Sequence, residues 1–209
     1  RILFDSPHQD ETEVYAEEVL KHFMSLAFRR PVRPEELARK MELFQETYAA
    51  ENDFLTAIQE PLVATLVSPQ FLFITEDMAV APEQRRPLGD YEIASRLSYF
   101  LWSTMPDETL LSLASDGVLT KPDVLKQQID RLLQDERASE FHRGFMTQWL
   151  GLAKLDDLMI EDERWIVRTG LKTSMREEPA QLFAELLRRH ASLLNFLDSD
   201  FAMLNERLA

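Results

Sequence analysis

The chain has 209 residues, no cysteine and a formal net charge of −14. The missing cysteines exclude disulfide bonds, thiolate catalysis and cysteine-ligated zinc or iron–sulfur centres. The negative charge disfavours nucleic acid and anionic membrane surfaces as partners, and it suits either solubility alone or a basic partner. Only five glycines are present, and such a composition favours helix.

Apolar residues recur at helical spacing from the start of the chain. The first helix is expected over residues 11–29, with Pro31 after its end because the residue before proline avoids the α region. On this helix Glu18 and His22 are four residues apart, which predicts a surface or half-buried pair. A second helix is expected to begin near Pro34, a favoured first-turn residue.

The third predicted helix covers residues 53–67, with Asp53 as its N-cap. Pro61 lies inside this segment and should kink or split the helix. A short turn then carries three apolar residues, 71–73, which we interpret as core. Residues 77–88 show no periodicity and contain two prolines, so a linker is predicted there and assigned to residues 80–88.

The central predicted helix, residues 91–102, has the strongest apolar stripe of the chain. Arg96 interrupts this pattern and is expected to pair with an acid, either Glu92 or Asp107. The side chains expected to be largely buried, in this helix and in a later one, are Leu97, Phe100, Trp102, Phe145 and Trp149.

The remaining stripes predict helices to nearly the end of the chain, and no run of alternating period two suggests a strand. The expected helices cover residues 107–114 with Asp107 as N-cap, 120–133, 138–150, 162–175, a continuation to about 190 after a kink or restart at Pro179, and a short segment after a turn at 198–200.

Catalytic and metal-binding patterns are scarce. None of the four histidines belongs to an inward-facing Glu-x-x-His pair, and no His-Glu-x-x-His or phosphate-binding glycine loop is present. Acidic residues gather between positions 156 and 163, but without the spacing of a calcium loop, so a solvated loop is the preferred interpretation.

Two similar tripeptides, residues 29–31 and 85–87, read Arg-Arg-Pro. They suit either an anion site or compensation of a helix dipole and ion pairing with the acidic surplus, and the second interpretation is favoured. Trp102, Trp149 and Trp165 suit either a sugar platform or the core, and the core is favoured because the first two lie on apolar helix faces.

Two groups of motifs resemble known families. The segments 27–32, 36–37 and 66–73, with Glu76, resemble the planctomycete-specific domain PSD5 (DUF1595). The following domain resembles PSD4 (DUF1592), through the segments 93–102, 106–107, 110–111, 145–150 and 204–209, together with Met175 and Glu178.

This resemblance implies a large exported protein with a c-type haem domain upstream, a cytochrome-like segment downstream and, in some relatives, carbohydrate-binding modules. Asp5 and Tyr15 stand where many relatives have cysteines that would tie the N-terminus, and Pro179 stands where relatives have threonine. The first residue is Arg1 rather than methionine, which suggests a piece of a longer protein.

The predicted fold is all-α, an irregular multi-helix bundle of two abutting helical subdomains. The expected domains are a DUF1595-like domain at 1–79 and a C-terminally truncated DUF1592-like domain at 89–209. No catalytic, metal or cofactor-binding residue is assigned, and any haem c is expected in flanking domains. The candidate structural motif residues are Arg29, Arg30, Arg96, Trp102, Asp107, Trp149 and Glu178.

The expected function is a non-enzymatic scaffold or interaction module of a periplasmic or otherwise extracytoplasmic protein that contains cytochrome c. Its expected partners are the flanking cytochrome-c-like domains of the same chain, with no nucleic acid and no membrane. The alternative is part of an oxidoreductase or polysaccharide-active enzyme whose site is completed by flanking haem domains. A carbohydrate-binding module is a third, weaker interpretation.

Overall fold

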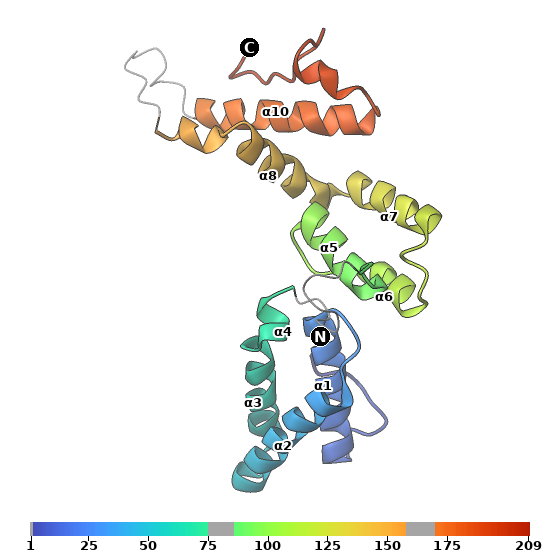
Figure 1. Cartoon of the computed structure of the whole chain (residues 1–209). Coiled ribbons are helices and arrows are strands. Elements are labelled where there is room, and N and C mark those ends of the chain that lie inside the picture. The colour runs from blue at the N-terminus through green and yellow to red at the C-terminus, as the bar shows by residue number, and fades with distance from the viewer. Residues whose placement is uncertain (1, 75–85, 158–169) are drawn as a thin grey trace. The chain divides into compact units, whose positions relative to one another are not determined.

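The structure, a computed structural model, describes residues 2–74, 86–157 and 170–209 (Figure 1). These residues form α-helices and short 3-10 helices, and no strand occurs among them. The all-α prediction is therefore confirmed. The chain divides into two compact units, unit 1 with residues 1–96 and 105–121, and unit 2 with residues 97–104 and 122–209.

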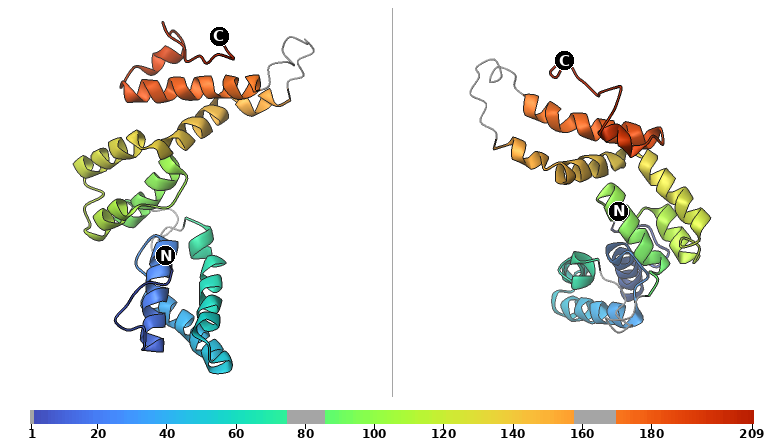
Figure 2. Two further views of the ribbon diagram at one scale, coloured as in Figure 1. Left: turned by 180° about the vertical axis from the view of Figure 1, so that it is seen from behind. Right: turned by 45° about the horizontal axis from the view of Figure 1, so that its top comes forward.

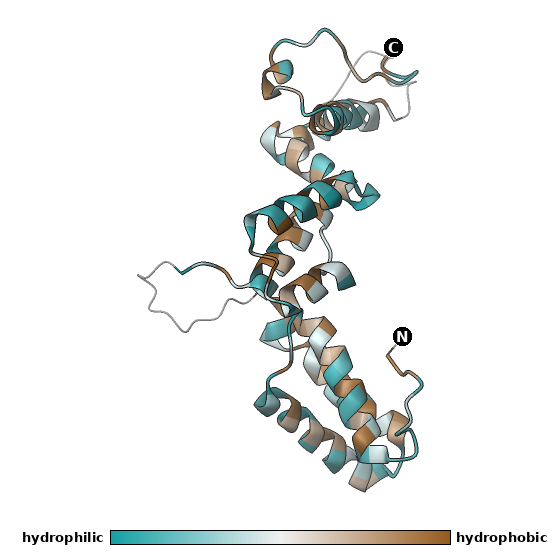
Figure 3. Ribbon diagram, turned by 90° about the vertical axis from the view of Figure 1, so that its right-hand side faces the viewer, coloured by the Kyte–Doolittle hydropathy of each residue, from teal (hydrophilic) through white to brown (hydrophobic). Residues whose placement is uncertain are grey.

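Unit 1 begins with four helices, α1 (Thr12–Phe28), α2 (Pro34–Glu51), α3 (Phe54–Leu66) and α4 (Pro69–Leu72). The first three helices all pack against one another (Figure 1). Figure 3 shows hydrophobic and hydrophilic residues mixed along each of them, as in amphipathic helices that share one core. The core residues are Tyr15, Ala16, Val19, Leu20, Met24, Phe28, Phe44, Ala57 and Ile58.

Local sequence signals account for most helix ends in unit 1. Pro34 is the first residue of α2, as predicted. Asp53 caps α3, and its carboxylate accepts the Thr56 amide hydrogen bond at 2.8 Å. Of the kink or split predicted at Pro61, the split does not occur, because α3 continues through this residue. Pro61 is buried, so its packing offsets the loss of one backbone hydrogen bond.

The core assignment of residues 71–73 is also wrong. All three side chains are exposed, and α4 has no buried residue. A helix of four residues makes a single turn, so its apolar side chains point in several directions and one neighbour covers only part of them.

The rest of unit 1 contains the first half of α5 (Asp90–Trp102) and α6 (Glu108–Ser115). Asp107 caps α6, as predicted, since its Oδ1 accepts the Leu110 amide hydrogen bond at 3.0 Å. Leu110 and Ala114 then turn their side chains into the core.

The described residues of unit 2 form the second half of α5 and six further elements, of which α8 and α10 pack side by side in both views of Figure 2. The elements are α7 (Pro122–Gln134), η1 (Glu136–Ala138), α8 (Ser139–Trp149), η2 (Leu152–Leu155), α10 (Leu171–Arg188) and η3 (Leu193–Phe196). Its buried apolar residues include Leu132, Met146, Leu171, Phe183 and Leu186.

Two expectations for unit 2 differ from the structure. Of the kink or restart predicted at Pro179, the restart does not occur, because α10 runs through this buried residue. The short helix expected after residue 200 is absent from the described residues 201–209, and η3 lies earlier in the chain instead. The expected start of the helix at residue 162 lies outside the described residues, as do Trp165 and most of the 77–88 linker.

The residues predicted to be in the core differ in how far they are buried. Trp102 is 3% exposed, which confirms the prediction, and Leu97 is half-buried. Phe100, Phe145 and Trp149 are 64%, 41% and 57% exposed, so for these three the prediction is wrong. None of the described helices is long and apolar enough to cross a membrane.

Candidate functional site

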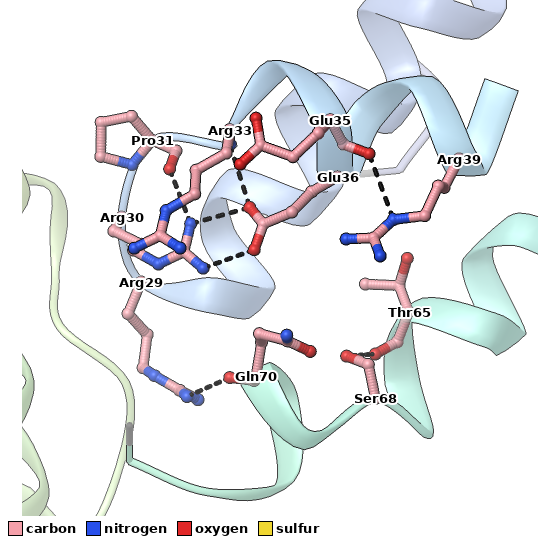
Figure 4. Close-up of polar contacts among 10 residues, drawn as sticks. All are labelled: Arg29, Arg30, Pro31, Arg33, Glu35, Glu36, Arg39, Thr65, Ser68 and Gln70. Carbon is pink, nitrogen blue, oxygen red and sulfur yellow. Dashed lines mark hydrogen bonds and ion pairs between the residues drawn. The ribbon is translucent and has the colours of Figure 1, made fainter. Parts of the chain in front are cut away.

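Arg29 ties the end of α1 to the end of α4 (Figure 4). Its side chain is nearly buried, and its guanidinium donates hydrogen bonds to the carbonyl oxygens of Gln70, Phe71 and Phe73 at 2.7, 3.2 and 2.9 Å. These carbonyls lie at the C-terminal end of α4, where a cation is favourable. Arg29 therefore has a structural role, in line with the dipole-compensation interpretation of the first Arg-Arg-Pro.

Arg30 clamps the start of α2 (Figure 4). Its two terminal nitrogens donate to the two carboxylate oxygens of Glu36 at 2.9 and 2.7 Å. Glu36 also accepts the Arg33 amide hydrogen bond at 3.0 Å, which closes a capping arrangement. The Arg30 hydrogen bonds lower the pKa of the buried Glu36 carboxyl below its usual value, against the opposing effect of burial.

The second Arg-Arg-Pro forms the same arrangement at α5. Arg86 donates to both carboxylate oxygens of Glu92, one of them at 2.7 Å, and Glu92 accepts the Gly89 amide hydrogen bond at 2.7 Å. In both clamps the arginine also donates to the carbonyl of the following proline, and the glutamate lies six residues after the arginine. We call these two arrangements the Arg-Pro clamps.

Within unit 1 a small cavity of about 30 Å³ lies where residues of both clamps meet. Arg29, Arg30 and Glu92 contribute to its lining, together with Tyr91 and Ser95. This volume holds one or two water molecules and no organic ligand. The contacts of the two clamps thus fix helix entry points.

The other predicted motif residues of α5 and α10 differ in exposure. Trp102 donates its indole N–H to the Leu132 carbonyl at 2.9 Å, and the Arg137 guanidinium carbon lies 3.4 Å from the ring centroid. Arg96 is exposed on α5, and its pairing with Glu92 or Asp107 stays a prediction. Glu178 is half-buried on α10.

An exposed aromatic face runs along α8 and continues onto η3. Centroid distances between successive rings are 4.9, 5.8, 5.8 and 5.4 Å, in the order Phe100, Phe141, Phe145, Trp149 and Phe196. The three α8 members are four residues apart, so they share one side of the helix. Three exposed leucines, Leu193, Leu194 and Leu197, lie in or next to η3. We call these eight residues the aromatic face.

The aromatic face explains why the burial predictions failed. Phe145 and Trp149 do touch neighbours, since Phe183 of α10 lies 5.1 Å from Phe145 and Phe196 lies 5.4 Å from Trp149. Within the described residues these neighbours leave 41% of Phe145 and 57% of Trp149 exposed. The apolar spacing correctly predicted which side of α8 carries the aromatics, but it contains no information on whether another element covers that side.

A second feature of unit 2 is a pocket of about 550 Å³, which we call the α8 pocket. It lies among α7, η1, α8 and α10, and its volume is that of a small-molecule site. Its lining residues are Asp130, Leu133, Gln134, Asp135, Glu136, Ser139, His142, Arg143, Glu177, Ala180, Gln181, Ala184, Leu187, Arg188 and His190.

His142 is the distinctive polar group of the α8 pocket. Its Nε2 is buried and has no hydrogen-bond partner in the described part of the chain. Burial lowers the pKa of the imidazole, so the ring is neutral at pH 7. No sequence signal pointed to this histidine, because the pocket depends on contacts among four separate elements.

Asp156 of the acidic loop and the N-terminal His8 have structural contacts, while residues 158–163 of this loop lie outside the described residues. Asp156 pairs with Arg176, and its carbonyl accepts a hydrogen bond from Lys172 at 3.0 Å. The predicted Glu18–His22 pairing is wrong, because His8 takes that place with Nδ1 2.7 Å from Glu18. No cluster of three potential His, Asp or Glu metal ligands occurs among the described residues.

Comparison with known proteins assigns the chain to a family. Residues 15–76 match PSD5, a protein of unknown function (DUF1595), and residues 88–209 match PSD4, a protein of unknown function (DUF1592). The chain belongs to the PSD4 family and carries the PSD5 match before it, in the order that the sequence motifs predicted. No curated protein and no solved structure gives a match.

Proposed function

We propose that this chain is a non-enzymatic helical scaffold and interaction module of a larger extracytoplasmic protein, and that its aromatic face docks a basic, cytochrome-c-like domain. The observation that carries the proposal is the exposure of Phe100, Phe145 and Trp149, together with that of three leucines in or next to η3. The resemblance to the two families supports the cytochrome context and the extracytoplasmic location, and the haem belongs to the flanking domain.

Exposed apolar clusters of this kind are characteristic of binding surfaces. Single exposed apolar residues are common, but a contiguous set on one side of a helix and the next element is typical of an interaction site. Trp and other large aromatics dominate binding energies at such sites because they bury a large area with few rotatable bonds. Trp149 is the central candidate, since it joins α8 to η3 through its contact with Phe196.

Charge complementarity supports a basic partner. The chain carries 37 acidic and 23 basic residues, Lys and Arg together, which gives its net charge of −14. Such a surplus attracts a positively charged domain and speeds its encounter, while the apolar contact supplies affinity. A basic domain of the cytochrome c type satisfies both conditions.

The docking is tested by amide hydrogen exchange on the full-length protein and on this chain alone. We expect slower exchange for α8 and η3 in the full-length protein, and Trp149→Ser should abolish this difference. The matched control is Leu55→Ser, which changes a similarly exposed apolar residue of α3 in unit 1. Equal exchange of α8 and η3 in both proteins overturns the docking, and full-length protein without covalent haem overturns the cytochrome context.

The enzyme alternative rests on one observation, the neutral imidazole of His142 in the α8 pocket. A neutral histidine is the commonest general base. In this alternative a flanking haem domain completes the site. It requires that the full-length protein reduces its haem on addition of an oxidisable substrate, and that His142→Asn slows this reduction at least tenfold without changing the melting temperature. A rate unaffected by His142→Asn dismisses it.

A further inference from the structure

We propose that the α8 pocket binds an organic cation, a small molecule with an apolar body and an ammonium group. This inference is independent of the docking function, because none of the aromatic-face residues lines the α8 pocket. The pocket lies entirely within unit 2.

The interior of the α8 pocket suits an aliphatic body. Leu133 of α7 and three residues on one side of α10, Ala180, Ala184 and Leu187, provide its apolar lining. The two alanines leave space that larger side chains would fill. The only ring system in the lining apart from His190 is the imidazole of His142, so stacking of a sugar ring on an aromatic platform is not favoured.

The charges around the α8 pocket favour a cation. The lining contains four carboxylates, Asp130, Asp135, Glu136 and Glu177, against the two guanidinium groups of Arg143 and Arg188. An ammonium group gains from this excess of negative charge, whereas a carboxylate or phosphate is repelled.

Both arginines of the lining are already engaged by carboxylates. Arg143 contacts Glu140 and Glu177, each at 2.9 Å, and Arg188 contacts Glu185 at 2.7 Å. Neither is a free anion receptor. Three of the four carboxylates are engaged as well, Asp130 by Lys126, Asp135 by Arg137 and Glu177 by Arg143. Glu136, by contrast, has no ion pair within the described residues, and it is an exposed member of the lining. Glu136 is therefore the carboxylate we assign to the ammonium group.

His142 contributes to the lining of the α8 pocket. Its Nε2 is shielded from solvent and has no hydrogen-bond partner in the parts of the chain that the structure describes. A ligand in the pocket therefore lies against the His142 side chain, while its ammonium group meets Glu136.

Three probes with the same six-carbon chain test the proposal: n-hexylammonium, n-hexanol and n-hexanoate. Calorimetry should give the tightest binding for n-hexylammonium, at least tenfold tighter than for n-hexanol, and the weakest for n-hexanoate. Nitrogen NMR of the His142 ring should shift on addition of n-hexylammonium. Equal affinities for the three probes, or no saturable binding of n-hexylammonium, overturn the proposal.

Substitutions in and outside the lining test whether n-hexylammonium binds in the α8 pocket. Glu136→Gln should weaken n-hexylammonium at least threefold, whereas Asp123→Asn, which makes the same charge change at an exposed position of α7 outside the lining, should not. Ala184→Leu should reduce binding by filling the α8 pocket, and Trp149→Ser should leave it unchanged. Equal weakening by Glu136→Gln and Asp123→Asn shows a general charge effect and rejects the assigned site.

Discussion

Replacement of Arg29 tests whether the contact between α1 and α4 stabilises unit 1. Arg29→Ala removes a guanidinium that donates to three carbonyl oxygens at 2.7 to 3.2 Å. Hydrogen bonds from a charged group contribute about 1.5–3 kcal/mol each, but they are not additive. The residues that provide these carbonyls are partly exposed, so water replaces part of what is lost. Release of the held side chain restores up to about 2 kcal/mol of entropy. We therefore expect a net loss of about 2–3 kcal/mol.

The backbone at Arg29 provides a built-in control. Its φ of 58° lies in the left-handed region, which costs a non-glycine residue roughly 1–2 kcal/mol. Arg29→Gly removes the same guanidinium and also this cost. It should therefore be less destabilising than Arg29→Ala, by about 1 kcal/mol. Arg29→Lys keeps the charge without the planar fork and should fall between wild type and alanine.

Urea unfolding followed by circular dichroism measures these differences, and the melting temperature of Arg29→Ala should fall by on the order of 5–10 °C. If Arg29→Ala unfolds at the wild-type urea concentration, the contact with α4 contributes nothing. If Arg29→Gly is more stable than wild type, the backbone cost exceeds the value of the hydrogen bonds. Either result refutes the structural role assigned to Arg29.

Three further changes have defined outcomes. Tyr15→Phe removes the hydrogen bond from the tyrosine hydroxyl to the Phe4 carbonyl, 2.9 Å long, and amide exchange of residues 2–8 should quicken while α1 stays protected. Glu36 has a pKa lowered mainly by Arg30, so its stabilisation is present above the unfolded-state pKa and is lost as the pH falls below it. Urea unfolding between pH 7 and pH 3 should thus show a shallower loss of stability for Glu36→Gln. Arg96→Ala should lower the melting temperature by several degrees, and an unchanged value favours a functional role for this exposed arginine.

Helix starts were predictable because their signals are local. Asp53 and Asp107 each accept an amide hydrogen bond from the residue three positions later, and Pro34 begins α2. Of the predicted kink or break at the two prolines inside helices, the break occurs at neither. Pro61 and Pro179 are both buried, and the packing that keeps their helices continuous comes from residues distant in the sequence.

The aromatic face and the α8 pocket, our two proposed binding sites, were harder to predict for a different reason. A stripe at helical spacing shows which side of a helix is apolar, but the same pattern describes a core residue such as Trp102 and an exposed one such as Trp149. The α8 pocket cannot be recognised from helical spacing, because its lining combines side chains from α7 to α10. No neighbouring residue in the sequence forms a motif with His142 that would indicate a binding role.

In the two Arg-Pro clamps, the role of a short motif depends on the three-dimensional contact between its arginine and a later glutamate. An arginine before proline cannot continue the preceding helix, and the glutamate six residues later lies in the first turn of the next helix, where it accepts an amide hydrogen bond. The chain must turn back within this span for Arg30 to reach Glu36, and for Arg86 to reach Glu92. Each clamp therefore fixes the direction in which a new helix leaves the loop. Since one clamp starts α2 and the other starts α5, the same local chemistry sets a helix entry in both the PSD5 and the PSD4 segments.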